Sequence, residues 1–77
     1  MNRIREVREA AGVTQSALYR KLGWKQPRLA NYEAGIRTPS LGDARAIVAA
    51  LNALGVAGDL VDVFPPETDQ QPAAMAS

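Results

Sequence analysis

The sequence predicts one small all-α domain made of five short helices. Apolar residues recur at intervals of three and four along several segments, which is the pattern of amphipathic helices. Glycines separate these segments, and small polar residues that cap helices precede several of them. Hydrophobic residues make up 47% of the 77 residues and aromatic residues only 5%, so we expect a core of closely packed aliphatic helices.

The first two helices are defined by their caps. The first should begin after Asn2 and end near residue 11, before Gly12. The second should follow Thr14 and end near residue 22, where Gly23 can turn the chain with a positive φ at no steric cost. Their apolar residues are Ile4, Val7 and Ala11 in the first helix and Ala17, Leu18 and Leu22 in the second.

The third helix is expected over about residues 26–34. Pro27 lies in its first turn, where the missing amide would have no helical partner. Trp24 precedes the helix and is expected to be an apolar plug beneath the turn, and Gly35 ends the helix.

The fourth helix is the predicted core helix. Ser40 should cap it, and Asp43 stands three residues later, as in a capping box with Asp in place of Glu. Gly55 ends the helix. Its apolar positions are Leu41, Ala44, Ile47, Val48, Leu51 and Leu54.

A short fifth helix over about residues 58–63 completes the predicted domain. Pro65 and Pro66 stop it, and the remaining residues are polar, Ala-rich and without periodicity. We therefore assign residues 1–64 to the domain and residues 65–77 to a flexible, disordered C-terminal tail.

Charge is distributed unevenly along the chain although the net charge is only +1. Residues 20–37 contain five basic residues and one acidic residue, whereas residues 38–77 contain one basic and five acidic residues. This asymmetry suggests that one face attracts a polyanion, although a solvated helix face would give the same count.

The residue types exclude several functions. There is no cysteine and no histidine, so disulfides, zinc sites, thiol nucleophiles and a histidine base are not expected, and no metal or cofactor is implied. The first six residues lack the apolar core of a secretion signal, and no apolar stretch is long enough to span a bilayer. We expect a cytoplasmic protein without membrane association.

The spacing of particular residues resembles the lambda-repressor-like helix-turn-helix domains of the Xre and Cro type. The resemblance covers residues 4–64. The matching residues are Ile4-Arg5, Arg8, Gly12-Val13-Thr14-Gln15, Leu18, Leu22-Gly23, Gln26, Leu29, Tyr32-Glu33, Gly35, Arg37, Pro39 and Leu54-Gly55. It implies a compact five-helix fold that binds double-stranded DNA.

The resemblance implies a set of contacts to DNA phosphates. Gln15 lies in the first turn of the second helix, where free amides and the helix dipole favour an anion, and in the family this glutamine clamps a phosphate. Arg37 resembles the family's backbone-contacting arginine. Lys25 replaces the usual Ser or Thr cap and is expected to contact a phosphate instead. Tyr19 replaces a small alanine, and its hydroxyl is a further candidate.

The third helix resembles the recognition helix of the family. Gln26 can bond adenine bidentately, and Arg28 can bond either guanine or a phosphate. Asn31, one turn further on, is a third candidate for base contact. Pro27 cannot donate a hydrogen bond, so it offers apolar contact with a base or serves only to start the helix.

Arg8 and Glu33 match a pair that forms a partly buried ion pair in the family, joining the first helix to the third. We interpret them primarily as a structural ion pair that holds the recognition helix, with DNA contact as a secondary role for Arg8.

The resulting hypothesis is a sequence-specific, Cro-like repressor of bacterial or phage type that binds operator half-sites as a homodimer. Leu60, Val61 and Phe64 are the candidate dimer interface, or else they close the core over the fourth helix.

Two alternatives belong to other classes of function. One is the antitoxin of a toxin–antitoxin pair, with residues 65–77 binding a small protein toxin. The other is a protein-interaction module without DNA binding. Without His, Cys or a converging pair of carboxylates, the sequence offers no catalytic residue for an enzyme.

Overall fold

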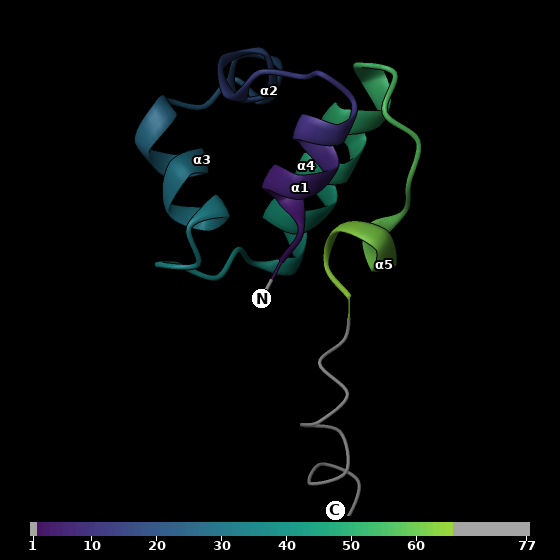
Figure 1. Cartoon of the computed structure of the whole chain (residues 1–77). Coiled ribbons are helices and arrows are strands. Elements are labelled where there is room, and N and C mark those ends of the chain that lie inside the picture. Colours follow the sequence, from purple (N-terminus) through teal and green to yellow (C-terminus); the bar gives the residue numbers. More distant parts are fainter. Residues whose placement is uncertain (1, 66–77) are drawn as a thin grey trace, which may run out of the picture.

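Five helices follow one another through residues 2–65, the part of the chain that the computed structural model describes (Figure 1). They are α1 (Ile4–Ala10), α2 (Gln15–Leu22), α3 (Gln26–Glu33), α4 (Leu41–Ala53) and α5 (Leu60–Val63). The described residues contain no strand, so the all-α prediction is confirmed. The predicted tail, residues 65–77, lies outside the described residues except for Pro65.

The predicted caps explain where the helices begin and turn. The Thr14 hydroxyl accepts a hydrogen bond from the Ala17 amide at 3.0 Å and starts α2. Gly23 ends α2 with a φ of 76°, in the left-handed region that glycine adopts freely. At the start of α4 the Ser40 hydroxyl accepts from the Asp43 amide at 3.1 Å.

Several local predictions were wrong in detail. Helix α1 begins at Ile4 with Arg3 as its N-cap, and the Asn2 side chain reaches past Arg3 to accept from the Ile4 amide at 3.1 Å. Ala11, predicted to be one of the apolar residues of the first helix, is instead its exposed C-cap. The capping box expected at Ser40 does not form, because the Asp43 carboxylate binds other residues.

The core draws at least one side chain from each helix. Its largest fully buried side chains are Ile4, Leu18, Leu29, Ile47, Leu51 and Val63. Leu41, predicted to lie on the apolar face of α4, is instead 58% exposed because it is the first residue of the helix. None of the helices in residues 2–65 is long and apolar enough to cross a membrane.

Figure 1 shows α3 and α5 on opposite sides of the fold, with α1 and α4 between them. Helix α2 packs against both α3 and α4. The Arg3 amide donates a hydrogen bond to the Val63 carbonyl at 2.7 Å, so the start of α1 is fastened to the end of α5. This arrangement leaves the N-terminal end of α3, with Gln26, Pro27 and Arg28, on the surface.

Candidate nucleic-acid interface

A three-residue turn joins α2 to α3. The Trp24 amide donates to the Tyr19 carbonyl at 2.9 Å, which closes the turn after Gly23. The Trp24 ring is half-buried against the core and meets the Tyr32 ring edge-on, with centroids 5.7 Å apart. The predicted role of Trp24 as an apolar plug at this turn is confirmed. This edge-on contact joins the turn before α3 to the last turn of the same helix.

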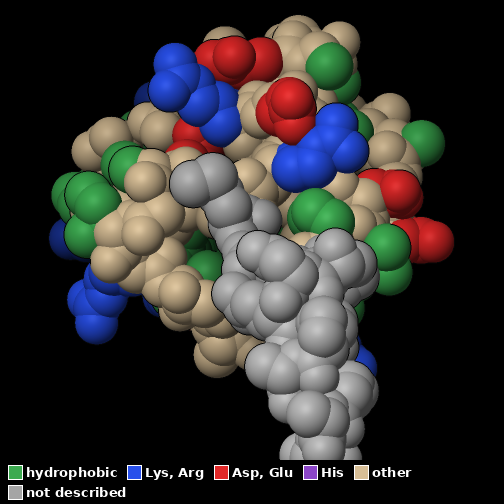
Figure 2. All heavy atoms as spheres, turned by 60° about the horizontal axis from the view of Figure 1, so that its bottom comes forward, with side chains coloured by type: hydrophobic (Ala, Val, Ile, Leu, Met, Phe, Trp, Pro, Cys, Tyr) green, Lys and Arg blue, Asp and Glu red, His purple; other side chains and the backbone are tan. Residues whose placement is uncertain are grey.

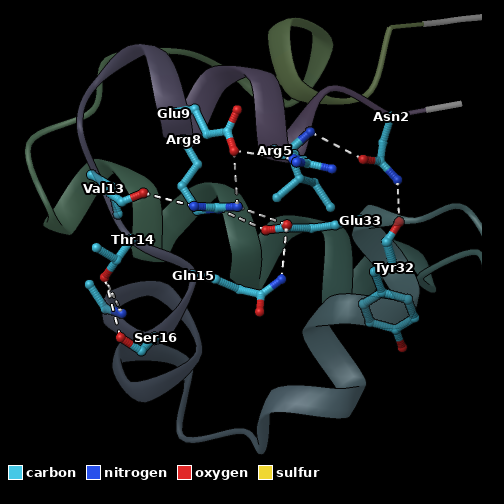
Figure 3. A network of polar contacts seen from close by, with 12 residues as sticks. Asn2, Arg5, Arg8, Glu9, Val13, Thr14, Gln15, Ser16, Tyr32 and Glu33 are labelled. Atoms are coloured by element: carbon cyan, nitrogen blue, oxygen red, sulfur yellow. Dashed lines mark hydrogen bonds and ion pairs between the residues drawn. The ribbon is translucent and has the colours of Figure 1, made fainter.

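A buried ion pair attaches α3 to α1. The Arg8 guanidinium donates to Glu33 twice, from Nε to Oε2 at 2.9 Å and from Nη2 to Oε1 at 3.0 Å (Figure 3). Its Nη1 donates to the Val13 carbonyl at 2.9 Å. The two charged side chains are only 8% and 4% exposed. This is the pair that the resemblance implied, and its bidentate geometry fixes the position of α3 relative to α1.

Two further hydrogen bonds connect this ion pair to α2 and to the start of α3. Gln15 Nε2 donates to Glu33 Oε1 at 3.1 Å, and Gln26 Nε2 donates to Gln15 Oε1 at 3.1 Å. Figure 3 shows the Gln15 side chain directed at Glu33. Both glutamines were predicted to contact DNA, but the hydrogen bond between them was not predicted. Four side chains therefore form one chain of contacts from Arg8 to the surface at Gln26.

Arg28 occupies a different environment from the one expected of a free DNA-contacting arginine. Its Nη2 donates to both oxygens of Asp43, at 3.0 and 2.9 Å, and its guanidinium carbon lies 4.0 Å from the centre of the Trp24 ring. The Tyr32 hydroxyl donates to the same carboxylate at 2.7 Å. Asp43 was interpreted only as the partner of Ser40 in a capping box, so its contact with Arg28, 15 residues away in the sequence, was missed.

The two partners of Asp43 also affect its ionisation. The hydrogen bond from the Tyr32 hydroxyl, followed by that from Arg28, holds the pKa of the Asp43 carboxyl below its ordinary value. The Asp43 hydrogen bond in turn raises the pKa of the Tyr32 hydroxyl. Asp43 is therefore negatively charged at neutral pH.

The other predicted DNA-contacting residues lie near this end of the fold without forming one cluster. Lys25 and Arg37 are exposed and form no ion pair with any residue of the range 2–65. Arg37 lines an open hollow together with Arg28, Asn31 and Tyr32.

Three further predicted residues differ in exposure. Pro27 is exposed within the first turn of α3, and Asn31 is half-buried. The Asn31 carbonyl accepts from the amides of Ile36 and Arg37, at 3.0 and 3.2 Å, which folds the loop after α3. The Tyr19 ring is half-buried against the core.

The residues predicted to form a dimer interface differ in exposure. Val61 is 63% exposed, whereas Leu60 and Phe64 are half-buried and Phe64 packs against the core. On the face that Figure 2 shows, hydrophobic side chains are scattered in small groups between acidic and basic ones. The structure therefore gives Phe64 the core-closing role that was the alternative for these three residues, and leaves Val61 free for contact.

Helices α2 and α3 form a helix-turn-helix in a basic segment of the chain, and the Arg8–Glu33 ion pair fixes α3. These features define a class of DNA-binding domain. The comparison with known families agrees with this class: the model of the helix-turn-helix domain matches residues 2–64, nearly all of the described fold. The chain belongs to the helix-turn-helix domain family. No curated protein and no solved structure shows a significant match to it.

Proposed function

We propose that this protein is a sequence-specific transcriptional regulator that binds double-stranded DNA in the manner of the Xre and Cro repressors. The chain of contacts Arg8–Glu33–Gln15–Gln26 is the observation that carries the proposal. At one end the buried Arg8–Glu33 ion pair fixes α3. At the other end the exposed Gln26 side chain is oriented by its hydrogen bond to Gln15. Such pre-organisation suits a side chain that reads a base edge in a groove.

Gln26 is the proposed base-reading residue. Its side-chain oxygen Oε1 and its second Nε2 hydrogen have no partner among residues 2–65. Oε1 can accept from N6 of adenine while Nε2 donates to N7. Pro27 and Asn31 lie on the same helix and contribute base contacts in this proposal. The Gln15 side chain, fixed between Glu33 and Gln26, adds a phosphate contact at the start of α2.

Phosphate contacts supply the affinity that does not depend on sequence. Lys25 precedes α3 and Arg37 follows it, so the two exposed cations flank the reading helix. Tyr19 adds a third candidate contact through its hydroxyl. These residues fix the register of the domain on the duplex but do not distinguish one sequence from another.

A dimer on the operator is part of the proposal. Helix α3 has only eight residues, so a single copy contacts few base pairs. Two copies related by a two-fold axis would bind half-sites about one helical turn, roughly 34 Å, apart. The exposed Val61, with the outer parts of Leu60 and Phe64, is the proposed contact between copies.

The experiment is selection of bound duplexes from a random DNA pool, followed by affinity measurements at several salt concentrations. We expect a palindromic consensus and an affinity that falls steeply with salt, by about 0.9 in the logarithmic slope per phosphate contact. Absence of binding to any duplex at low salt would overturn the proposal and favour a protein-interaction module.

A further inference from the structure

The Arg28 guanidinium is held on two sides. Its face lies over the Trp24 ring, with 4.0 Å between the guanidinium carbon and the ring centroid. Its Nη2 group donates to both oxygens of Asp43, at 3.0 and 2.9 Å. An exposed arginine near the start of a reading helix normally samples many rotamers, and here stacking and pairing select one of them.

Asp43 is itself well fixed for this purpose. It stands in the first turn of α4, where its amide donates to the Ser40 hydroxyl. The Tyr32 hydroxyl donates to Oδ2 at 2.7 Å, and the side chain is 24% exposed compared with 48% for Arg28. The carboxylate therefore occupies a defined position beside α3.

The pair changes what Arg28 offers to DNA. Asp43 cancels the positive charge of Arg28, whereas Lys25 and Arg37 on either side have no such partner among residues 2–65. Arg28 makes no hydrogen bond from Nε or Nη1 within those residues, so these donors remain available. A phosphate attracts Arg28 weakly because it must compete with the carboxylate.

We propose that Asp43 is a specificity-determining residue that withholds Arg28 from the phosphates of non-specific DNA. The inference rests on the DNA-binding function proposed above. Non-specific affinity comes almost entirely from cation–phosphate contacts, so an arginine removed from that set lowers non-specific binding. Arg28 then contributes on a sequence whose acceptors fit the donors that the pair leaves free.

The test compares Asp43→Asn with Glu6→Gln on non-specific duplex DNA. Both substitutions remove one carboxylate from an arginine pair, but Glu6 pairs with Arg3, the N-cap residue of α1, and lines the hollow beside Gly55. We expect Asp43→Asn to steepen the logarithmic salt slope by about 0.9 and to raise non-specific affinity about five- to tenfold near 0.1 M salt. Affinity for the selected operator should rise less, so the specificity ratio falls.

Arg28→Ala, made in both backgrounds, shows whether the effect passes through Arg28. In the Asp43→Asn background it should remove the gained slope, and in the wild type it should change the non-specific slope by less than about 0.3. The wild-type comparison does not depend on how well Asp43→Asn folds, because it leaves Asp43 in place.

Three results would overturn the inference. These are a salt slope of Asp43→Asn equal to that of Glu6→Gln, a gain in slope that persists without Arg28, and a loss of a full phosphate contact from the wild-type slope in Arg28→Ala. Each of these leaves DNA binding by the wild type intact and so spares the proposed function. Failure of the wild type to bind any duplex at low salt overturns both.

Discussion

Replacing Glu33 with alanine tests the buried Arg8–Glu33 ion pair that attaches α3 to α1. The substitution removes both acceptors of the Arg8 guanidinium and the acceptor of the Gln15 amide. Arg8, whose side chain is 8% exposed in the wild type, would keep its hydrogen bond to the Val13 carbonyl and a longer contact, 4.0 Å, with the Glu9 carboxylate. The variant therefore leaves a buried positive charge whose remaining counter-charge, Glu9, is 55% exposed and accepts no hydrogen bond from it.

The expected cost is large relative to the stability of so small a domain. Removing one partner of a buried ion pair costs about 3–5 kcal/mol. A chain of this length is typically stable by roughly 4–12 kcal/mol in total. Since 1 kcal/mol shifts the midpoint of a small domain by about 4–8 °C, the melting temperature should fall by at least roughly 12 °C.

Thermal unfolding followed by circular dichroism measures this change, with Glu6→Ala as the matched control. Glu6 also pairs with an arginine, the N-cap residue Arg3, but both side chains of that pair are more than half exposed, 52% and 65%. Such an exposed pair contributes only about 0–1 kcal/mol. If Glu33→Ala melts within a few degrees of Glu6→Ala, the stabilising role assigned to the buried Arg8–Glu33 ion pair is refuted.

The remaining predictions concern DNA binding and pH. Gln26→Ala should lose about 1–3 kcal/mol of discrimination at one base-pair position of the selected operator, and equal loss on all sequences would contradict base reading. Arg37→Ala should instead weaken binding on every duplex and reduce the salt slope by about one, so selective loss at a single base would argue against phosphate contact. Asp43, whose pKa lies below its ordinary value of 3.8, should stabilise the fold above that pH and lose this contribution as the pH falls through its folded-state value. Acid unfolding of Asp43→Asn should therefore converge with that of the wild type at low pH; a constant difference at all pH values would be inconsistent with the linkage.

Local chemistry made much of the fold predictable. Thr14 and Ser40 cap helices because their hydroxyls satisfy amides that no helical carbonyl can reach. Gly23 turns the chain where a positive φ is needed. The Arg8–Glu33 pair was accessible through the family resemblance, since the spacing of both residues matched a known pattern.

The missed features depend on how the helices are oriented in space. Asp43 follows Ser40 by three residues, a pattern that indicates a local capping box, yet its carboxylate binds Arg28 and Tyr32 on α3. The carboxylate binds these two side chains, one of them charged, in place of the Ser40 backbone amide that a capping box would use. Likewise the Gln15–Gln26 bond depends on the angle between α2 and α3, which helical periodicity does not encode.

The hydrogen bond from the Arg3 amide to the Val63 carbonyl has a practical consequence. Because the two ends of the described fold meet there, a polypeptide enters and leaves the domain at nearly the same point. A domain of this kind can be inserted into a surface loop of another protein without forcing the loop apart. The helix-turn-helix, formed by residues between these two ends, would then be carried as a self-contained module on its host.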